Sequence, residues 1–386
     1  MLIGVVGAPN KGKSTFFSAA TLVDAQIANY PFTTINPNRG VTYVRTPCPH
    51  VALGLKSCNP KNSKCVDGTR LVPVNIIDVA GLVPGAHEGK GLGNKFLDNL
   101  READALIQVV DATGKTDLQG NPCDSCDPAL EVEFLEEEVA LWLADIMARG
   151  TAKGKGLHEI AAALTGLKID EAMLLHAAQD CGLDIADGLP NDKEEVEALA
   201  LAVLKRRMPI VVAANKADVP GAKENASALK EGCEHPVFPC SAAVELALRK
   251  AEQHGMIKYV PGAKEFEVVG APDEKQAEAL ERMAALLRDN NGSGVQQIID
   301  WVVYQKLHCI VVYPVEDEHK YANHKGEALP DACLVPKGTT AHQLAAMVHT
   351  DLAHKFIGAI DVRRHIRVGA EHPLNDGDVI KIVAGH

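Results

Sequence analysis

Short, nearly continuous runs of apolar residues recur along the chain. They are Leu2–Val6, Val72–Asp78, Ala105–Asp111 and Pro209–Asn215, and the last three end on an aspartate or an asparagine. Strands of this kind, without alternation of apolar and polar residues, are typical of a parallel sheet buried on both faces. The pattern therefore predicts an α/β fold with a parallel-type sheet and flanking helices.

A helical periodicity fills the segment between the third and fourth runs. Its apolar positions recur at spacings of three and four residues, at Val132, Leu135, Val139, Trp142 and Ile146. Because roughly a hundred residues is too long for one crossover between strands, we expect a helical insertion at residues 112–208. The alternative is that these helices only cover the sheet.

Patterns in the last third of the chain predict three helices and then a β-rich ending. The helices are expected at 243–254, 274–288 and 295–306, and strands near 309–313 and 377–383. Together the patterns divide the chain into three domains. These are an α/β domain at 1–111 and 209–306, the insertion at 112–208, and a separate C-terminal domain at 307–386.

Composition and charge limit the classes of partner. The chain has 386 residues and a net charge of −12, whereas proteins that bind nucleic acid nonspecifically are usually basic. Contact with RNA would therefore need a local patch, such as the basic cluster formed by Arg363, Arg364, His365 and Arg367. No long apolar run or basic leader is visible, and the ten cysteines suit a reducing compartment. We expect a cytoplasmic monomer that does not bind membranes.

The first strand leads into a phosphate-binding loop. Gly7-Ala8-Pro9-Asn10-Lys11-Gly12-Lys13-Ser14 fits the pattern G-x-x-x-x-G-K-S between a strand and a helix. We expect Lys13 to reach the β- and γ-phosphates and Ser14 to bind Mg²⁺. The expected nucleotide-binding residues of this loop are Pro9, Asn10, Lys11, Gly12, Lys13, Ser14 and Thr15.

Two further segments have the character of a nucleotide switch. Asp78 ends a strand and can hold Mg²⁺ through a water, while the Gly81 N–H can meet the γ-phosphate. Thr34, in the loop after the first helix, can bind Mg²⁺ only while the γ-phosphate is present, which would order that loop in the triphosphate state. The alternative is an ordinary polar loop residue.

A base-recognition segment follows the fourth strand. Asp218, in Asn215-Lys216-Ala217-Asp218, can accept two N–H bonds from guanine, whereas adenine offers no matching pair of donors. The stem of Lys216 can lie over the base, and Asn215 can tie this segment to the phosphate-binding loop. Ser241 and Ala242 can close the base pocket with their backbone N–H groups.

These segments resemble the Obg superfamily of GTPases. The similarity is strongest to its YchF-related branch, through Asp78–Leu97 and Asn29–Thr34. The stretches Lys337–Thr340, His349–Leu352 and Asp376–Ile380 resemble a TGS domain. The resemblance implies a P-loop GTPase with a helical insertion and a C-terminal β-grasp-like TGS domain that contacts RNA or the ribosome. Some YchF relatives with an N-x-x-E segment prefer ATP, so Asp218 favours GTP.

The resemblance also bears on catalysis, for which we name Lys13, Asn10, Gly81 and Thr34. Leu82 occupies the position where many GTPases have a glutamine that orients water, so intrinsic hydrolysis should be slow. An asparagine at the position of Asn10 helps related GTPases to hold K⁺, which implies stimulation by K⁺. The alternative is that Asn10 only braces the loop. For His87, in the same loop as Leu82, we favour an exposed histidine over a catalytic one.

The sequence therefore predicts a protein that hydrolyses GTP to GDP with Mg²⁺ and acts as a switch linked to the ribosome or translation. Two alternatives remain, an ATPase of the YchF type and a nucleotide-gated binding module with negligible turnover.

The cysteines are compatible with free thiols, a metal site or a redox pair. Cys48, Cys58 and Cys65 fall in one insertion with His50 beside them, and Cys123 and Cys126 form a C-x-x-C pair. C-x-x-C pairs are common in zinc sites, but a second pair at zinc-ribbon spacing is missing. Free thiols in loops are the favoured interpretation, with structural zinc and a redox pair as alternatives.

Overall fold

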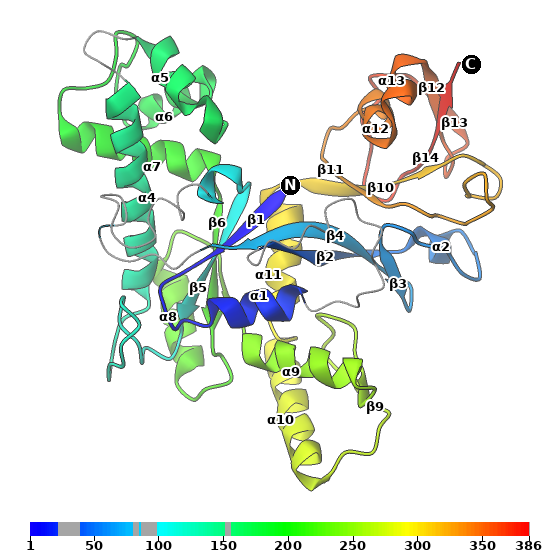
Figure 1. Cartoon of the computed structure of the whole chain (residues 1–386), viewed down its shortest axis with the longest axis horizontal. Coiled ribbons are helices and arrows are strands. Elements are labelled where there is room, and N and C mark those ends of the chain that lie inside the picture. The colour runs from blue at the N-terminus through cyan, green and yellow to red at the C-terminus, as the bar shows by residue number, and fades with distance from the viewer. Residues whose placement is uncertain (22–38, 80–84, 86–98, 151–155, 386) are drawn as a thin grey trace. The chain divides into compact units, whose positions relative to one another are not determined.

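The computed structural model describes residues 1–21, 39–79, 85, 99–150 and 156–385, and these form two compact units (Figure 1). The first unit holds residues 1–21, 39–40 and the described part of 75–298. The second holds residues 41–74 and 299–385. The strand β4 (Thr69–Asp78) passes from the second unit into the first. Each unit is described by itself below.

A parallel sheet forms the centre of the first unit. Its strands run in the order β4, β1 (Leu2–Val6), β5 (Ala105–Asp111), β6 (Ile210–Asn215) and β7 (Val237–Pro239). Every residue of β1, β5 and β6 is buried, which explains why their sequences do not alternate. The predicted parallel sheet is confirmed, and its carboxyl edge holds the ends of β1, β4, β5 and β6.

Helices between β5 and β6 both cover this sheet and form a core of their own. They are α4 (Ala129–Gly150), α5 (Leu157–Leu164), α6 (Glu171–Asp180) and α7 (Lys193–Arg207), with a 3-10 turn at Thr165–Leu167. Leu135 and Leu204 pack with Leu106 of the sheet, whereas other faces of α4 and α7 pack on α5 and α6. Helices are thus present as expected, and the boundaries 112–208 remain a prediction.

The first unit contains further helices outside this group. They are α1 (Lys13–Thr21), α8 (Ala222–Gly232), α9 (Ala242–Gln253) and α10 (Glu274–Asn290), with a small hairpin of β8 (Ile257–Lys258) and β9 (Glu267–Val268). The helix α11 (Val295–Trp301) begins in the first unit and ends in the second. The helices predicted near 243–254 and 274–288 are confirmed. The third, expected at 295–306, changes after Trp301 into a π-helical turn, Val302–Lys306.

The second unit contains a five-stranded sheet. Its order is β11 (Cys333–Pro336), β10 (Cys309–Val315), β14 (Val379–Ala384), β12 (Phe356–Asp361) and β13 (Ile366–Val368). The helix α12 (Ala341–Val348) packs Leu344 on Val312 and Ile380 of the sheet, and α13 (Thr350–His354) follows it. The predicted β-rich C-terminal module is confirmed.

The second unit also includes a part of the chain that is distant in sequence. Most of β2 (Arg39–Pro47), the short helix α2 (Pro49–Ala52), β3 (Lys64–Val66) and the first half of β4 belong to it. Asn59 donates its N–H to the Ala328 carbonyl at 2.8 Å, and Lys61 donates to the Pro330 carbonyl at 2.7 Å. No helix in the described part of the chain has the length and apolarity needed to cross a bilayer.

Candidate functional site

The phosphate-binding loop has a backbone that only certain residues tolerate. Gly12 has φ of +91°, and a Cβ there would lie 2.2 Å from Asn215 Nδ2, so a larger residue cannot fit. Asn10 also has a positive φ, of +62°, which asparagine tolerates better than most residues. The Phe16 N–H donates to the Gly12 carbonyl at 2.8 Å, so the loop passes directly into α1. A helix N-terminus of this kind favours a bound anion.

Three predicted residues meet where β1 and β4 end. Ser14 Oγ donates to Asp78 Oδ2 at 3.2 Å, and Lys13 Nζ lies 3.9 Å from Asp78 Oδ1. Burial lowers the pKa of Lys13, which the charge of Asp78 opposes. Burial raises the pKa of Asp78, which Lys13 and Ser14 oppose. The side chains therefore hold opposite charges close together without a tight ion pair.

The same three residues fit a magnesium ion. Asp78 Oδ1 is buried and has no hydrogen-bond partner among the described residues, which is costly unless a ligand compensates it. A carboxylate and a hydroxyl oxygen are ligands that Mg²⁺ accepts, usually together with waters and phosphate oxygens. Ser14 and Asp78 are therefore the described residues that would hold the ion, and their role as ligands stays a prediction.

Lys11 lies in the same loop, but its side chain points into the protein. Its Nζ is fully buried and donates to Glu131 Oε1 at 2.7 Å, to Thr116 Oγ1 at 2.8 Å and to the Thr116 carbonyl at 2.9 Å. Only the backbone of Lys11 is therefore left to contact a nucleotide. The side chain instead holds the loop to α4 and to the segment after β5.

The segment after β5 also touches the other side of the loop. Asn10 Nδ2 donates to the Gly120 carbonyl at 2.9 Å, and a Cβ on Gly120 would lie 2.8 Å from the Pro9 carbonyl oxygen. Cys123 and Cys126 lie in this segment and are joined by a disulfide, so free thiols are the wrong interpretation for this pair.

Asn215 connects the base-recognition segment to the loop, as predicted. Its Nδ2 donates to the Lys11 carbonyl at 3.0 Å, and its Oδ1 accepts from the Ala242 N–H at 3.0 Å. Lys216, which has a positive φ of +65°, donates through Nζ to Asp111 Oδ2 at 2.8 Å and to the Asn10 carbonyl at 3.2 Å. Both residues therefore brace the loop from the same side.

Asp218 is exposed, and its carboxylate accepts a hydrogen bond from Ser241 Oγ. The structure differs from the prediction for the backbone of the 241–242 segment. The Ser241 N–H donates to the Ser293 carbonyl, and the Ala242 N–H is used by Asn215. These two residues consequently support Asp218 and Asn215 from behind, rather than presenting free backbone donors.

Several residues of this network were not predicted as site residues. Asp111 is buried and accepts hydrogen bonds from Lys216, Thr113 and Thr116. Its position at the end of a buried strand was a usable signal, because the carboxyl edge of such sheets carries the ligand site. Glu131 gave no signal, since it is one of many acidic residues on α4. Thr34, Gly81, Leu82 and His87 lie outside the described residues.

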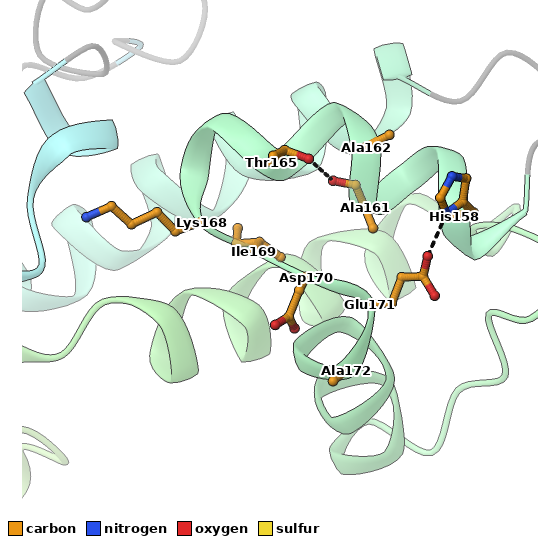
Figure 2. Close-up of a pocket in the computed structure, with 9 residues that line it drawn as sticks. All are labelled: His158, Ala161, Ala162, Thr165, Lys168, Ile169, Asp170, Glu171 and Ala172. Atoms are coloured by element: carbon orange, nitrogen blue, oxygen red, sulfur yellow. Dashed lines mark hydrogen bonds and ion pairs between the residues drawn. The ribbon is translucent and has the colours of Figure 1, made fainter. Parts of the chain in front are cut away.

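A separate pocket of about 670 Å³ lies among the helices α5 and α6 (Figure 2). His158 Nδ1 and Glu171 Oε1 face each other there at 2.7 Å, and this contact raises the pKa of His158. None of the predicted nucleotide-binding residues lines this pocket. The His158–Glu171 pair is exposed at the surface, as ordinary ion pairs on helices are.

The parallel sheet and the loop at its carboxyl edge define a P-loop nucleotide-binding protein. Family comparisons agree along the chain. The 50S ribosome-binding GTPase family matches residues 2–144, the Obg-like GTPase YGR210-like, G4 motif-containing domain matches 213–317, and the TGS domain matches 324–384.

Individual relatives that match nearly the whole chain identify the family within this class of P-loop proteins. The chain is 48% identical to the uncharacterized GTP-binding protein MJ1332 of Methanocaldococcus jannaschii, over 99% of both chains. It is 35% identical to the uncharacterized GTP-binding protein C428.15 of Schizosaccharomyces pombe, over 93% of this chain and 92% of the relative. It is 30% identical to the ribosome-binding ATPase YchF of Haemophilus influenzae, over 98% of this chain and 97% of the relative.

A solved structure agrees with these relatives. A GTP-binding protein from Pyrococcus horikoshii superposes with a TM-score of 0.78 at 38% identity, over 100% of both chains. The chain belongs to the YchF-type GTP-binding proteins of the Obg superfamily and carries their TGS domain. The resemblance identified from the sequence is confirmed.

Proposed function

We propose that this protein is a GTPase that hydrolyses GTP to GDP and phosphate with Mg²⁺ and acts as a nucleotide-dependent switch. The observation that carries the proposal is the meeting of Lys13, Ser14 and Asp78 at the carboxyl edge of the sheet, where no described residue forms a hydrogen bond with one of the Asp78 oxygens. A magnesium ion bound there would neutralise charge on the phosphate oxygens. Lys13 would orient and stabilise the same phosphates from the protein side.

Guanine recognition is assigned to Asp218. Its carboxylate is exposed and is fixed by the hydrogen bond from Ser241, so it is preorganised to meet a base. Preorganisation of this kind improves affinity because less freedom is lost on binding. The names of the relatives at 48% and 35% identity, both GTP-binding proteins, support this assignment.

The catalytic step is assigned to residues of the loop and of the switch segments. Asn10 uses its amide nitrogen on Gly120, so its amide oxygen is the atom able to contact a K⁺ ion. Thr34 and Gly81 are assigned to the switch from their motifs. Because Leu82 cannot orient water, we propose a slow basal rate that K⁺ raises.

Turnover of GTP and of ATP, each measured in K⁺ and in Na⁺, tests these assignments. We expect GTP to be hydrolysed faster than ATP, and K⁺ to stimulate. The matched control is Lys13→Met, which should lower turnover by more than about 100-fold. Equal rates in K⁺ and Na⁺ would remove Asn10 from the cation site.

The alternatives have their own outcomes in this experiment. The YchF relatives named ribosome-binding ATPases favour ATP use, and equal hydrolysis of ATP would support that function here. Tight GTP binding without measurable turnover would instead support a nucleotide-gated binding module.

We further propose that the TGS domain contacts the ribosome or RNA. Arg363, Arg364 and Arg367 are all exposed in and beside the turn between β12 and β13, on a chain whose net charge is −12. Arg363 is held there by its hydrogen bond to the Gly377 carbonyl at 3.0 Å. A local basic tip on an acidic protein favours a local phosphate contact. The ribosome-binding names of several relatives support the same partner.

Cosedimentation with ribosomes over a range of salt concentrations tests this partner. Replacing the three arginines by alanine should weaken binding and flatten its salt dependence. Replacing Lys193, Lys223 and Lys230, which lie on helices of the first unit, removes the same charge and should change little. Equal loss in both variants would show that only net charge matters. The expected monomeric state is checked by light scattering.

A further inference from the structure

Three cysteines and one histidine of the second unit form a cluster that the nucleotide site does not use. Its members, here called the Cys3His cluster, are Cys48, His50, Cys58 and Cys65. One ligand atom from each lies within 4.8 Å of all the others. The members come from the end of β2, the helix α2, the following loop and β3. Their meeting is therefore a product of the fold, whereas the sequence showed only that they fall in one insertion.

Two contacts in the cluster have the lengths of a tetrahedral metal site. Cys48 Sγ lies 3.7 Å from Cys58 Sγ, and Cys65 Sγ lies 3.8 Å from His50 Nδ1. Bonds of about 2.3 Å from zinc to sulfur and about 2.0–2.1 Å to nitrogen, at tetrahedral angles, separate two sulfurs by about 3.8 Å and a sulfur and a nitrogen by about 3.6 Å. Cys48 and Cys58 are also too far apart for a disulfide, which needs about 2.05 Å.

The backbone around the cluster is fixed by the β3–β4 hairpin. Asp67 and Gly68 both have positive φ, of +46° and +81°, as the two-residue turn of a hairpin requires. The Cys48 N–H donates to the Gly68 carbonyl at 2.8 Å, which brings the end of β2 to this turn. The ligand atoms are therefore positioned by main-chain contacts that do not depend on an ion.

Arg70 supplies a second and independent observation. It lies opposite Cys65 in the hairpin and is completely buried. Its nitrogens donate to Ser63 Oγ at 3.1 Å and to the Leu329 carbonyl at 2.8 Å, while Nε has no hydrogen-bond partner among the described residues. Its Cζ lies 5.5 Å from the centroid of the Tyr313 ring, and its charge opposes the rise that burial causes in the pKa of Asp331, with which it forms no close ion pair. The charge of this buried cation is therefore compensated only at a distance, which is costly.

We propose that the Cys3His cluster binds one Zn²⁺ as a closed structural site. Three thiolates, one neutral imidazole and Zn²⁺ together carry a single negative charge, which would compensate the charge of buried Arg70. All four tetrahedral positions are filled by the protein, so the ion has no open position for a substrate. Soft thiolate ligands with one imidazole at tetrahedral distances select zinc over Mg²⁺ or Ca²⁺.

The site would fix the loop that joins the cluster to the C-terminal module. Residues just after Cys58 bond to the segment 328–332. Asn62 Nδ2 donates to the Ala332 carbonyl at 3.0 Å, and the Ala332 N–H donates back to Asn62 Oδ1 at 2.9 Å. Zinc would hold the base of this loop, so its removal should loosen both the loop and the segment that it contacts.

Metal analysis of the full-length protein tests the proposal. The protein is produced with added zinc, kept reduced, and freed of any affinity tag. We expect about one zinc per chain in the wild type and in the matched control Cys181→Ser, whose thiol is remote in sequence and belongs to the first unit. Cys58→Ser should lower zinc affinity by more than about tenfold.

Two measurements on the wild type keep the test independent of whether Cys58→Ser folds. Chelator-treated protein titrated with Co²⁺ should show thiolate-to-cobalt charge transfer and the visible bands of tetrahedral cobalt. Hydrogen exchange should speed up in residues 58–63 and 328–332 when zinc is removed. A wild type that has no zinc and gives no tetrahedral cobalt spectrum would overturn the proposal, as would iron in place of zinc or full zinc retention in Cys58→Ser.

Discussion

Two lysines of the phosphate-binding loop have opposite environments. Lys11 points into the protein, here called the inner side of the loop, and Lys13 points toward Asp78, here called the outer side. On the inner side, Lys11 is completely buried and its Nζ makes three short hydrogen bonds, to Glu131 and Thr116. On the outer side, Lys13 lies 3.9 Å from Asp78, and the nearer Asp78 oxygen has no hydrogen-bond partner among the described residues. Satisfied charges hold a loop in place, whereas unsatisfied ones remain available to a ligand. Although the two lysines are two residues apart in sequence, Lys11 therefore holds the loop in place and Lys13 remains available to a ligand.

The inner side extends beyond the loop into a network of bonded charges. Thr116 Oγ1 donates to Asp111 Oδ2 at 2.7 Å, and Lys216 donates to the same oxygen at 2.8 Å. This network joins the end of β5, the loop and the base-recognition segment. We infer that it sets the distance between the phosphate end and the base end of the pocket. Substitutions on the inner side should therefore mainly lower stability, and substitutions on the outer side should mainly lower nucleotide affinity.

The largest expected effect is on stability, from Lys11→Met. The substitution leaves Glu131 buried without its cation, and loss of one partner from such a pair typically costs about 3–5 kcal/mol. Because Glu131 can take up a proton, we expect about 3 kcal/mol, near the lower end of that range. Chemical denaturation followed by circular dichroism measures it. The double variant Lys11→Met/Glu131→Leu should recover most of the loss, and a single variant as stable as the wild type would show that the pair is not structural.

Lys13→Met should lower nucleotide affinity and leave the stability of the fold nearly unchanged. Removing the outer lysine takes away a charge-assisted contact to the phosphates, and we expect nucleotide affinity to fall by about 100-fold, or about 2.7 kcal/mol. The thermal midpoint should barely change, because the contact of this lysine with Asp78, at 3.9 Å, is longer than a hydrogen bond. Fluorescent-nucleotide titration and thermal melting separate the two quantities. A large loss of stability with unchanged affinity would reverse the assignment of the two lysines.

The substitution Asp218→Asn tests recognition of the base at the other end of the pocket. The amide can accept only with its oxygen and presents an N–H₂ donor to the guanine donors, so we expect GTP affinity to fall by about tenfold to a hundredfold. Affinity for ATP should stay the same or rise slightly. Competition between the two nucleotides measures the ratio, and an unchanged ratio would mean that another group recognises the base.

The smallest expected effect is a pH dependence on the inner side. Burial raises the pKa of Glu131 to about 7, although Lys11 opposes the shift. The folded state then holds a proton that the unfolded state releases at lower pH. This raised pKa therefore makes the protein less stable as pH rises from about 5 to about 8. Unfolding free energies of the wild type and Glu131→Gln across this range should diverge by about 1 kcal/mol or more. Parallel profiles would contradict the raised pKa.

The sequence predicted the outer side better than the inner side. The parallel strands and the loop form a local pattern, and the strand that ends at Asp78 lies beside the strand that leads into the loop, so the neighbourhood of Lys13, Ser14 and Asp78 follows from topology alone. The pairing of Lys11 with Glu131 joins residues far apart in sequence. Nothing in the sequence distinguishes Glu131 from the other acidic residues of its helix.

The same limit applies to the second unit. Strand and turn signals predicted its sheet, including the last strand after Asn375-Asp376-Gly377. The members of the Cys3His cluster were grouped from the sequence, but zinc stayed an alternative to free thiols because their spacing matches no zinc ribbon and only the hairpin brings Cys65 back toward Cys48. The turn at Asp67-Gly68 was a usable signal for that hairpin. Convergence of single residues from separate elements needs the folded chain.

Equilibrium binding of non-hydrolysable GTP and ATP analogues with Mg²⁺ tests the central claim most directly. The claim is that Lys13, Ser14 and Asp78 grip a triphosphate whose base is read by Asp218. The account predicts that the guanine analogue binds about 100-fold more tightly than the adenine analogue, and that Lys13→Met weakens both equally. Equal affinity for the two analogues, or affinity that Lys13→Met leaves unchanged, would contradict it.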